Sequence, residues 1–163
     1  MKYYGDYHTH THYSDGVSKV WENIKQAMEK GLKELAFTDH GFNSPSYGAL
    51  TREKFDAQKK EIQAAREKCG DKLKIYQGVE ADIIGLDGEI DLLDEELGEM
   101  EILVMGYHSF AKAKSVKDWF KIFPSAYLSF LILDFAVLTP SIITPDLKTA
   151  SSLSKSGPLI FAT

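Results

Sequence analysis

Short apolar runs alternate with longer helical patterns along the first 120 residues of the chain. The short runs have the length and the branched or aromatic content of buried strands, and the longer segments suit crossover helices. This order is typical of parallel strands joined by helices, so it predicts an α/β fold. The predicted strands span 2–12 (ending in a loop), 34–38, 74–80 and 102–108, and a hairpin turning at Asp87-Gly88 spans 83–92.

Two segments between these strands have the periodicity of amphipathic helices. In the first, Val20, Ile24, Ala27 and Met28 recur at helical spacing and predict one buried face. Ser18 precedes them and is the predicted N-cap. The second segment, 51–68, is mostly charged and has a sparse apolar stripe of Phe55, Ile62 and Ala65.

The pattern changes after about residue 120. Residues 126–138 are apolar without clean strand or helix periodicity, and 139–163 are rich in Ser, Thr and Pro with few charges. We therefore expect one folded portion over 1–120 and a divergent, poorly ordered C-terminal tail over 121–163.

The composition is that of an ordinary soluble globular protein, and 163 residues suit one domain. There are 19 basic and 24 acidic residues, for a net charge of −5, which argues against a nucleic-acid partner. Cys69 is the single cysteine, and the polar start lacks an export signal, so we expect a cytoplasmic protein. The apolar stretch 126–138 is too short to cross a membrane, and no membrane partner is expected.

The histidines all lie at or just past the ends of predicted strands: His8, His10, His12, His40 and His108. In a barrel of parallel strands these ends converge on one face, where active sites are built. The imidazoles of His8 and His10, two residues apart on an extended backbone, point to the same side and can bind one cation. Imidazole and carboxylate ligands suit zinc, manganese or iron. The predicted metal ligands are His8, His10, Asp15, His40, Glu80 and His108.

Two neighbouring residues are left with alternative roles. His12 continues the alternation of His8 and His10, so it is either a third ligand or a residue that faces solvent or supports a ligand. Asp39 either caps the end of a strand as a turn residue or orients an imidazole from outside the ligand set.

Four short motifs, in this order and spacing, resemble those of the PHP (polymerase and histidinol phosphatase) family. They are Asp-Tyr-His-Thr-His-Thr at 6–11 with Ser-Asp-Gly at 14–16, Phe-Thr-Asp-His-Gly at 37–41, Gly-Val-Glu at 78–80 and Gly-Tyr-His at 106–108. Together they are specific, although each alone would be weak. The resemblance covers about residues 1–120, and implies the metal-binding portion of an incomplete, distorted (β/α)7 TIM-like barrel.

The resemblance also implies a cluster of up to three divalent ions (Zn, Mn or Fe) and the hydrolysis of phosphate esters. The substrate would be a small phosphorylated molecule such as histidinol phosphate, or a nucleotide end in polymerase-associated members. The implied ligand sets are His8, His10 and Glu80 for one ion, Glu80 and His108 for a second, and Asp15 and His40 for a third. The expected catalytic residues are His8, His10, Glu80 and His108.

The chain departs from the family pattern after the fourth motif. No histidine follows His108, and 163 residues are fewer than the roughly 200–250 of a full barrel of this kind. We therefore expect a truncated or frameshifted member of the family, whose activity stays open. A barrel with an open side would expose strand edges and favour self-association.

Three functions other than an active phosphoesterase stay open. The first is a non-catalytic metal-binding fragment or interaction module. An exonuclease acting on nucleic-acid ends is disfavoured by the acidic charge. A metal-dependent amide hydrolase with a related barrel is disfavoured by the motifs at 14–16 and 38–40. Lys112 and Lys114 are weak candidates for phosphate binding.

Overall fold

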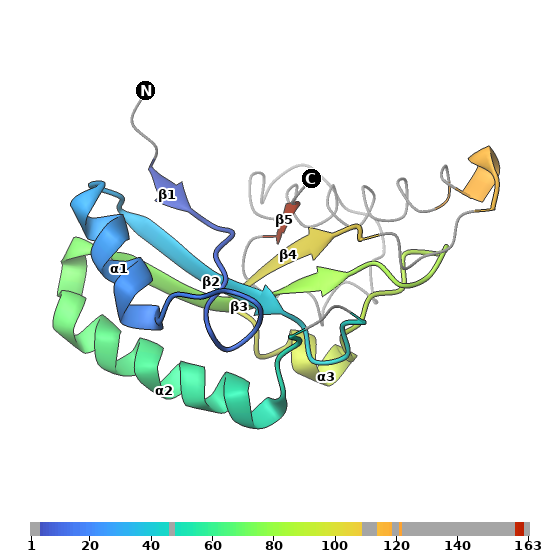
Figure 1. The fold of residues 1–163 in the computed structure, drawn as a ribbon. Coiled ribbons are helices and arrows are strands. Elements are labelled where there is room, and N and C mark those ends of the chain that lie inside the picture. Colours follow the sequence, from blue (N-terminus) through green and yellow to red (C-terminus); the bar gives the residue numbers. More distant parts are fainter. Residues whose placement is uncertain (1–3, 46–47, 109–113, 119–120, 122–158, 162–163) are drawn as a thin grey trace, which may run out of the picture.

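Five parallel strands form one sheet, in which their order follows the chain (Figure 1). The computed structural model describes residues 4–45, 48–108, 114–118, 121 and 159–161. The strands are β1 (Gly5–Asp6), β2 (Glu34–His40), β3 (Lys74–Asp82), β4 (Ile102–Gly106) and β5 (Leu159–Phe161). Adjacent parallel strands in chain order confirm the predicted fold, an incomplete α/β barrel of the TIM-like type in the part of the chain that is described.

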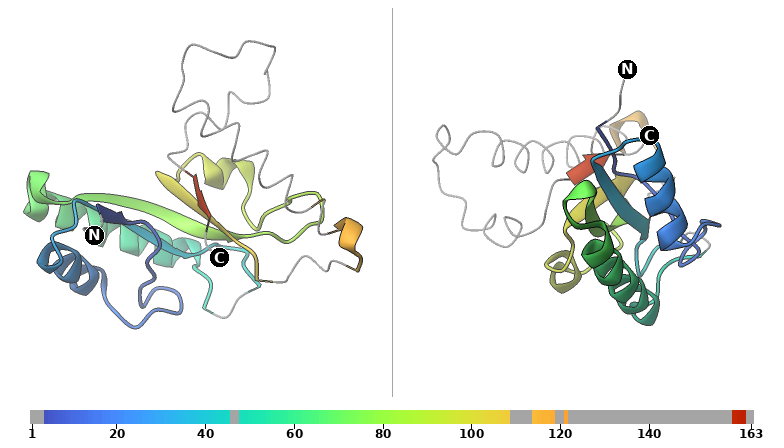
Figure 2. Two further views of the ribbon diagram at one scale, coloured as in Figure 1. Left: turned by 90° about the horizontal axis from the view of Figure 1, so that it is seen from above. Right: turned by 90° about the vertical axis from the view of Figure 1, so that its left-hand side faces the viewer.

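The helices are α1 (Val20–Glu29), α2 (Arg52–Cys69) and the short α3 (Asp94–Leu97), and a 3₁₀ turn, η1 (Gly70–Lys72), follows α2. α1 and α2 connect consecutive parallel strands and pack on the same face of the sheet (Figures 1 and 2). α3 lies beside the start of α2, where the Arg52 guanidinium pairs with Glu99 just after α3. α1 and α2 are therefore the crossover helices that the sequence predicted.

Two details of α1 differ from the sequence prediction. The N-cap is Lys19 rather than Ser18, whose carbonyl instead accepts a hydrogen bond from the His12 N–H at 2.9 Å. Met28 is 37% exposed, because it lies at the margin of the stripe formed by the buried Val20, Ile24 and Ala27. The predicted stripe of α2 is confirmed, and Thr51 caps this helix by accepting a hydrogen bond from the Lys54 N–H.

The two faces of the sheet carry different chemistry. Leu35 and Phe37 of β2 pack with α1 and α2 in one apolar cluster, and Val79 of β3 packs with Phe55 of α2 in another. Because side chains alternate along a strand, residues of even number in β2 and β3 lie on the opposite face. That face is therefore left to polar groups near the carboxyl ends of the strands.

The register of β2 and β3 places two of these polar groups side by side. Thr38 pairs with Gly78, and His40 pairs with Glu80. Paired residues of adjacent strands lie about 5 Å apart, so the His40 imidazole and the Glu80 carboxylate become neighbours without any contribution from a loop.

Little of the predicted tail is described. Of residues 121–163, the structure describes Lys121 and β5, which pairs with β4 through Leu103 and Leu159. Among the residues described, no helix combines the length and the apolar content that crossing a membrane requires. Lys112 lies outside the described residues, and the Lys114 N–H donates to Asp118.

A buried carboxylate closes the hairpin that follows β3. The bridge between Ile83 and Ile90 confirms the predicted turn, and Asp91 then lies beside Asp82, whose N–H donates to Asp91 Oδ1 at 2.7 Å. Asp91 Oδ2 is buried and accepts no hydrogen bond within the described part of the chain. Burial, reinforced by the charge of Asp82, raises the pKa of Asp91 from 3.8 to about 7.

We expect Asp91→Asn to flatten the pH dependence of stability. Since Asp91 binds its proton more tightly in the folded chain, the free energy of unfolding falls as pH rises from about 4 to about 7. The slope from this group is at most about 1.4 kcal/mol per pH unit. Urea unfolding across this range should show the slope reduced in Asp91→Asn and retained in Asp87→Asn, which changes an exposed carboxylate of the same hairpin. Equal slopes in the two variants would contradict the prediction.

Candidate metal centre

Three predicted ligands converge between the first loop and β3. His8 and His10 follow the short β1, and Glu80 lies near the end of β3. The Nε2 atoms of the two histidines are 3.2 Å apart, and Glu80 Oε2 lies 3.3 Å from His8 Nε2 and 3.1 Å from His10 Nε2. One ion could be held by these three atoms together.

A second group shares His10 with the first. His10 Nδ1 contacts Asp15 Oδ1 at 2.6 Å, and Asp15 Oδ2 lies 3.4 Å from His40 Nε2. The ligand atoms of His10, Asp15 and His40 are close enough together to hold a metal ion. The two groups are therefore adjacent parts of one centre.

The two oxygens of Glu80 face different imidazoles. Oε2 faces the first group and lies 3.4 Å from His40 Nδ1, whereas Oε1 lies 3.7 Å from His108 Nε2. The rings of His40 and His108 are also neighbours, with centroids 5.6 Å apart. A carboxylate in this position can bridge two ions. The structure thus brings all six predicted ligands together, although they lie up to 100 positions apart in the chain.

The residues present fit a divalent cation. His40 Nδ1 is buried and makes no hydrogen bond in the described structure, although it faces Glu80 Oε2. Burial of a nitrogen without a partner costs free energy, and a cation beside it would relieve this cost. Imidazole nitrogens with carboxylate oxygens are a donor set that zinc, manganese and iron accept.

The electrostatics of the centre favour ionised carboxylates. Burial by itself raises the pKa of Glu80, but the imidazoles of His10 and His8 outweigh burial and hold this pKa well below its ordinary value. Burial by itself also raises the pKa of Asp15, but the contact with His10 outweighs burial and lowers this pKa. Burial lowers the pKa of His10, but hydrogen bonds to Glu80 and Asp15 prevail and raise it to about 9. A cation binding to His10 therefore has to displace a proton.

Asp39 has neither of the roles predicted for it. It lies inside β2, is fully buried, and points to the helix side of the sheet because it alternates with His40. Its carboxylate accepts hydrogen bonds from the Thr11 N–H at 2.7 Å, the Ser14 hydroxyl and the Gln58 amide at 2.6 Å. It thereby fastens the first loop to β2 and α2, and this loop carries Asp15.

His12 lies apart from the ligand groups. Its ring is exposed and packs against Tyr13, with centroids 4.3 Å apart. The alternation breaks at Thr11, whose N–H and hydroxyl both bind Asp39, so the backbone turns before His12. The prediction that His12 is a third ligand is therefore wrong, and His12 is instead a residue that faces solvent.

Sequence reasoning missed Asp82, the last residue of β3. Asp82 is fully buried, and its Oδ1 lies 2.5 Å from Nδ1 of His108. The signal was available, since Asp82 follows Glu80 by two residues and so lies on the same face of the strand. Gln58 was also missed, because a polar residue within a charged helix carries no sign that it is buried.

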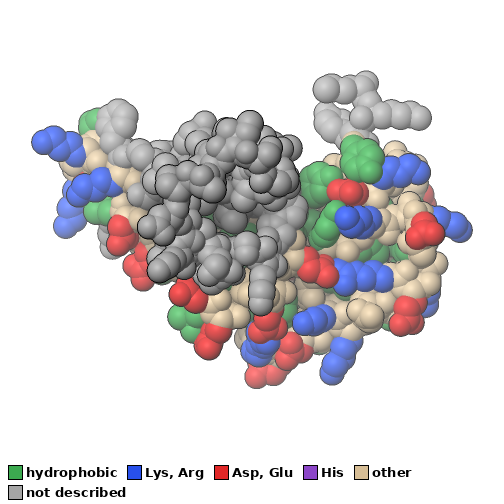
Figure 3. Space-filling view, turned by 180° about the vertical axis from the view of Figure 1, so that it is seen from behind, with side chains coloured by type: hydrophobic (Ala, Val, Ile, Leu, Met, Phe, Trp, Pro, Cys, Tyr) green, Lys and Arg blue, Asp and Glu red, His purple; other side chains and the backbone are tan. Residues whose placement is uncertain are grey.

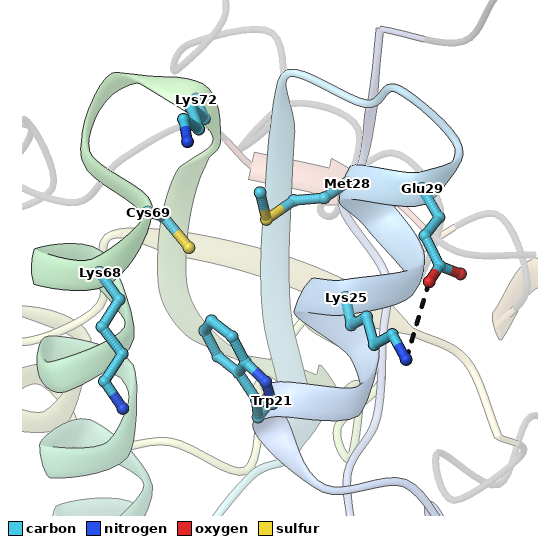
Figure 4. A pocket seen from close by; sticks show the side chains of 7 residues that line it. All are labelled: Trp21, Lys25, Met28, Glu29, Lys68, Cys69 and Lys72. Carbon is cyan, nitrogen blue, oxygen red and sulfur yellow. Dashed lines mark ion pairs between the residues drawn. The ribbon is translucent and has the colours of Figure 1, made fainter.

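A hollow that no histidine lines lies between α1 and α2 (Figure 4). In it the Lys68 ammonium lies 5.6 Å from the centroid of the Trp21 ring. The residues that line it are Trp21, Lys25, Met28, Glu29, Lys68, Cys69 and Lys72, none of which is a predicted ligand.

Acidic and basic side chains are interspersed on the described surface that Figure 3 shows, so the face in that figure does not point to a polyanionic ligand.

We expect Gly106→Ala to reduce the number of bound cations while the chain stays folded. A Cβ at Gly106 would lie 2.8 Å from Cε1 of His108 and still closer to Glu80 Oε1, so both ligands would have to shift. After dialysis against zinc, mass spectrometry should find at least about one ion fewer per chain than in the wild type. Gly98→Ala is the matched control, because its Cβ would lie 3.6 Å from the Glu95 carbonyl oxygen, an ordinary van der Waals contact. Equal zinc content in both variants would refute this assignment of the ligands.

Comparison with known proteins relates the sequence of this chain to one domain family. The sequence profile of the PHP domain matches residues 6–134. The chain is 36% identical over 105 residues to the DNA polymerase/3'-5' exonuclease PolX of Bacillus subtilis, covering 64% of this chain and 18% of that protein. It is 33% identical over 122 residues to a probable phosphatase of Shewanella pealeana, covering 72% of this chain and 45% of that protein. The chain thus spans less than half the length of these relatives, and it belongs to the PHP domain family.

Proposed function

We propose that this chain provides the centre of a metal-dependent phosphoesterase that acts on small phosphorylated molecules. The observation that carries the proposal is the position of Glu80, whose two carboxylate oxygens face separate imidazole groups. The similarity to proteins called probable phosphatases supports the same class of reaction.

The six ligands would hold the cations in three sets, two of which share Glu80. His8, His10 and Glu80 would hold one, and the other oxygen of Glu80 would hold a second together with His108. His40 and Asp15 would hold a third. Bound divalent cations supply Lewis-acid activation of water and neutralise the charge of phosphoryl oxygens.

The protein groups set the charge of this centre. Because four of the six ligands are imidazoles, neutral when they bind metal, the two carboxylates compensate only part of the positive charge of the cations. The remainder favours a phosphate dianion and the further negative charge that develops as its ester bond breaks. Exposure of 37% for the His8 side chain and 42% for the His108 side chain leaves access from solvent.

A nucleic-acid end is the second candidate substrate. It is favoured by the 36% identity to a protein that is a DNA polymerase and 3'-5' exonuclease. It is disfavoured by the net charge of −5, since nucleic-acid binding usually requires a basic surface. An end-labelled single-stranded oligonucleotide and an aryl phosphate, tested on the same preparation, would rank the two substrates.

We expect His10→Ala to abolish hydrolysis of an aryl phosphate, and His12→Ala to leave it within about twofold of wild type. His10 contacts both carboxylates of the centre, whereas His12 is an exposed neighbour outside it. Loss of a residue that merely supports a ligand already costs about 10–100-fold, so loss of a shared ligand should cost more than about 100-fold. The assay measures initial rates with added zinc, manganese or iron.

Chelation provides the control for this experiment. EDTA should remove the activity of the wild type and of His12→Ala, and an added divalent cation should restore both. Stoichiometric metal binding with no turnover of any phosphate ester would contradict the proposed function and favour a non-catalytic metal-binding module.

A further inference from the structure

We propose that Asp82 is a positioning residue that holds the His108 imidazole in one tautomer and one orientation, with Nε2 directed to the metal centre. Its Oδ1 lies 2.5 Å from His108 Nδ1, and on the far side of the ring Nε2 lies 3.7 Å from Glu80 Oε1. The ring nitrogen this close to a carboxylate carries a proton, so in the neutral ring Nε2 keeps the lone pair that a cation needs. The role in metal binding rests on the proposed function, but the tautomer does not.

His108 needs such a restraint more than His40, the neighbouring histidine of the centre, does. Its side chain is 42% exposed, against 7% for His40, because it lies two residues beyond the end of β4. A ring that is partly exposed can adopt more than one rotamer, and a hydrogen bond to a fixed acceptor favours one of them. Metal-binding histidines commonly donate their second ring N–H to a carboxylate in this way.

Asp82 is itself fixed from several directions. It is fully buried, and the Ser44 hydroxyl, from the loop after β2, donates to its Oδ2. Its backbone is tied to the hairpin, since its N–H donates to Asp91 Oδ1 and its carbonyl accepts from the Asp91 N–H at 3.1 Å. The carboxylate is therefore a rigid support for a ring that is otherwise half in solvent.

The position of Asp82 in β3 links this support to the bridging ligand. Glu80 and Asp82 are two residues apart on one strand and share a face. Gly106 of β4 pairs with Asp82, and the absence of a side chain there leaves room for the Glu80 carboxylate and the His108 ring to approach. One strand thus supplies both the carboxylate that would bridge the cations and the carboxylate that aims His108 toward them.

The test compares Asp82→Asn with Asp87→Asn in the full chain, the latter being an exposed carboxylate of the neighbouring hairpin. Long-range proton–nitrogen NMR of the metal-free protein, at a pH where imidazole is neutral, reports the tautomer of each histidine. We expect His108 to be protonated on Nδ1 in the wild type and in Asp87→Asn. In Asp82→Asn we expect it to shift toward the Nε2-protonated form, while the tautomers of His8 and His40 stay unchanged.

Titration with Co²⁺, followed by its visible absorption, supplies the second measurement. Asp82→Asn should weaken the binding of one cobalt ion by about 10–100-fold and leave the affinity for the others unchanged. A purely structural role for Asp82 would instead lower the unfolding midpoint and change neither the tautomer nor the cobalt affinity. That result, or a wild-type His108 protonated on Nε2, would overturn the proposal.

Two further arms keep the experiment decisive. If Asp82→Asn does not fold, Ser44→Ala replaces it, because it removes the hydrogen bond that the Ser44 hydroxyl donates to Asp82 Oδ2 and should weaken the binding of the same cobalt ion by several-fold. If the wild type binds cobalt but hydrolyses no phosphate ester, the proposed function fails while the positioning role is still supported by the tautomer. If the wild type binds no cobalt, both the proposed function and the role of Asp82 in metal binding are overturned.

Discussion

The centre depends on one buried carboxylate, that of Glu80, surrounded by imidazoles. Its side chain is 2% exposed, and its oxygens approach His8, His10, His40 and His108 at distances between 3.1 and 3.7 Å. Burial of a lone carboxylate would be costly, and the surrounding nitrogens keep this one ionised. A charge that needs several partners at once requires several segments of chain to be placed around it, and the fold supplies them.

The parallel sheet provides that placement by its register and its alternation. Pairing of His40 with Glu80 makes two ligands adjacent, and on the other face of the sheet Leu35 and Phe37 pack in an apolar cluster with α1 and α2. The same alternation sends Asp39 to the opposite face, where it binds Thr11, Ser14 and Gln58. Two consecutive residues therefore serve different purposes, since His40 enters the centre and Asp39 anchors the loop that carries other ligands.

The support of the ligands differs between the two sides of the centre. On the side of the first loop, His10 is held by contacts with Asp15 and Glu80, and the loop is held by Asp39. On the side of β4, His108 lies beyond the strand and contacts Asp82. Cations held by ligands from both sides would stabilise the folded arrangement of this region.

The sequence by itself determined the parallel α/β arrangement, the position of most elements and the six candidate ligands, because periodicity and strand-end motifs are local properties. It left the roles of Asp39 and His12 open, carried no sign that Gln58 is buried, and indicated that Asp82 shares the strand face of Glu80 without identifying His108 as its partner. These four outcomes depend on which strand face each residue occupies and on contacts 19 to 28 positions apart along the chain. Only the tertiary structure decides such contacts, since the register between strands and the path of the loops bring the partners together.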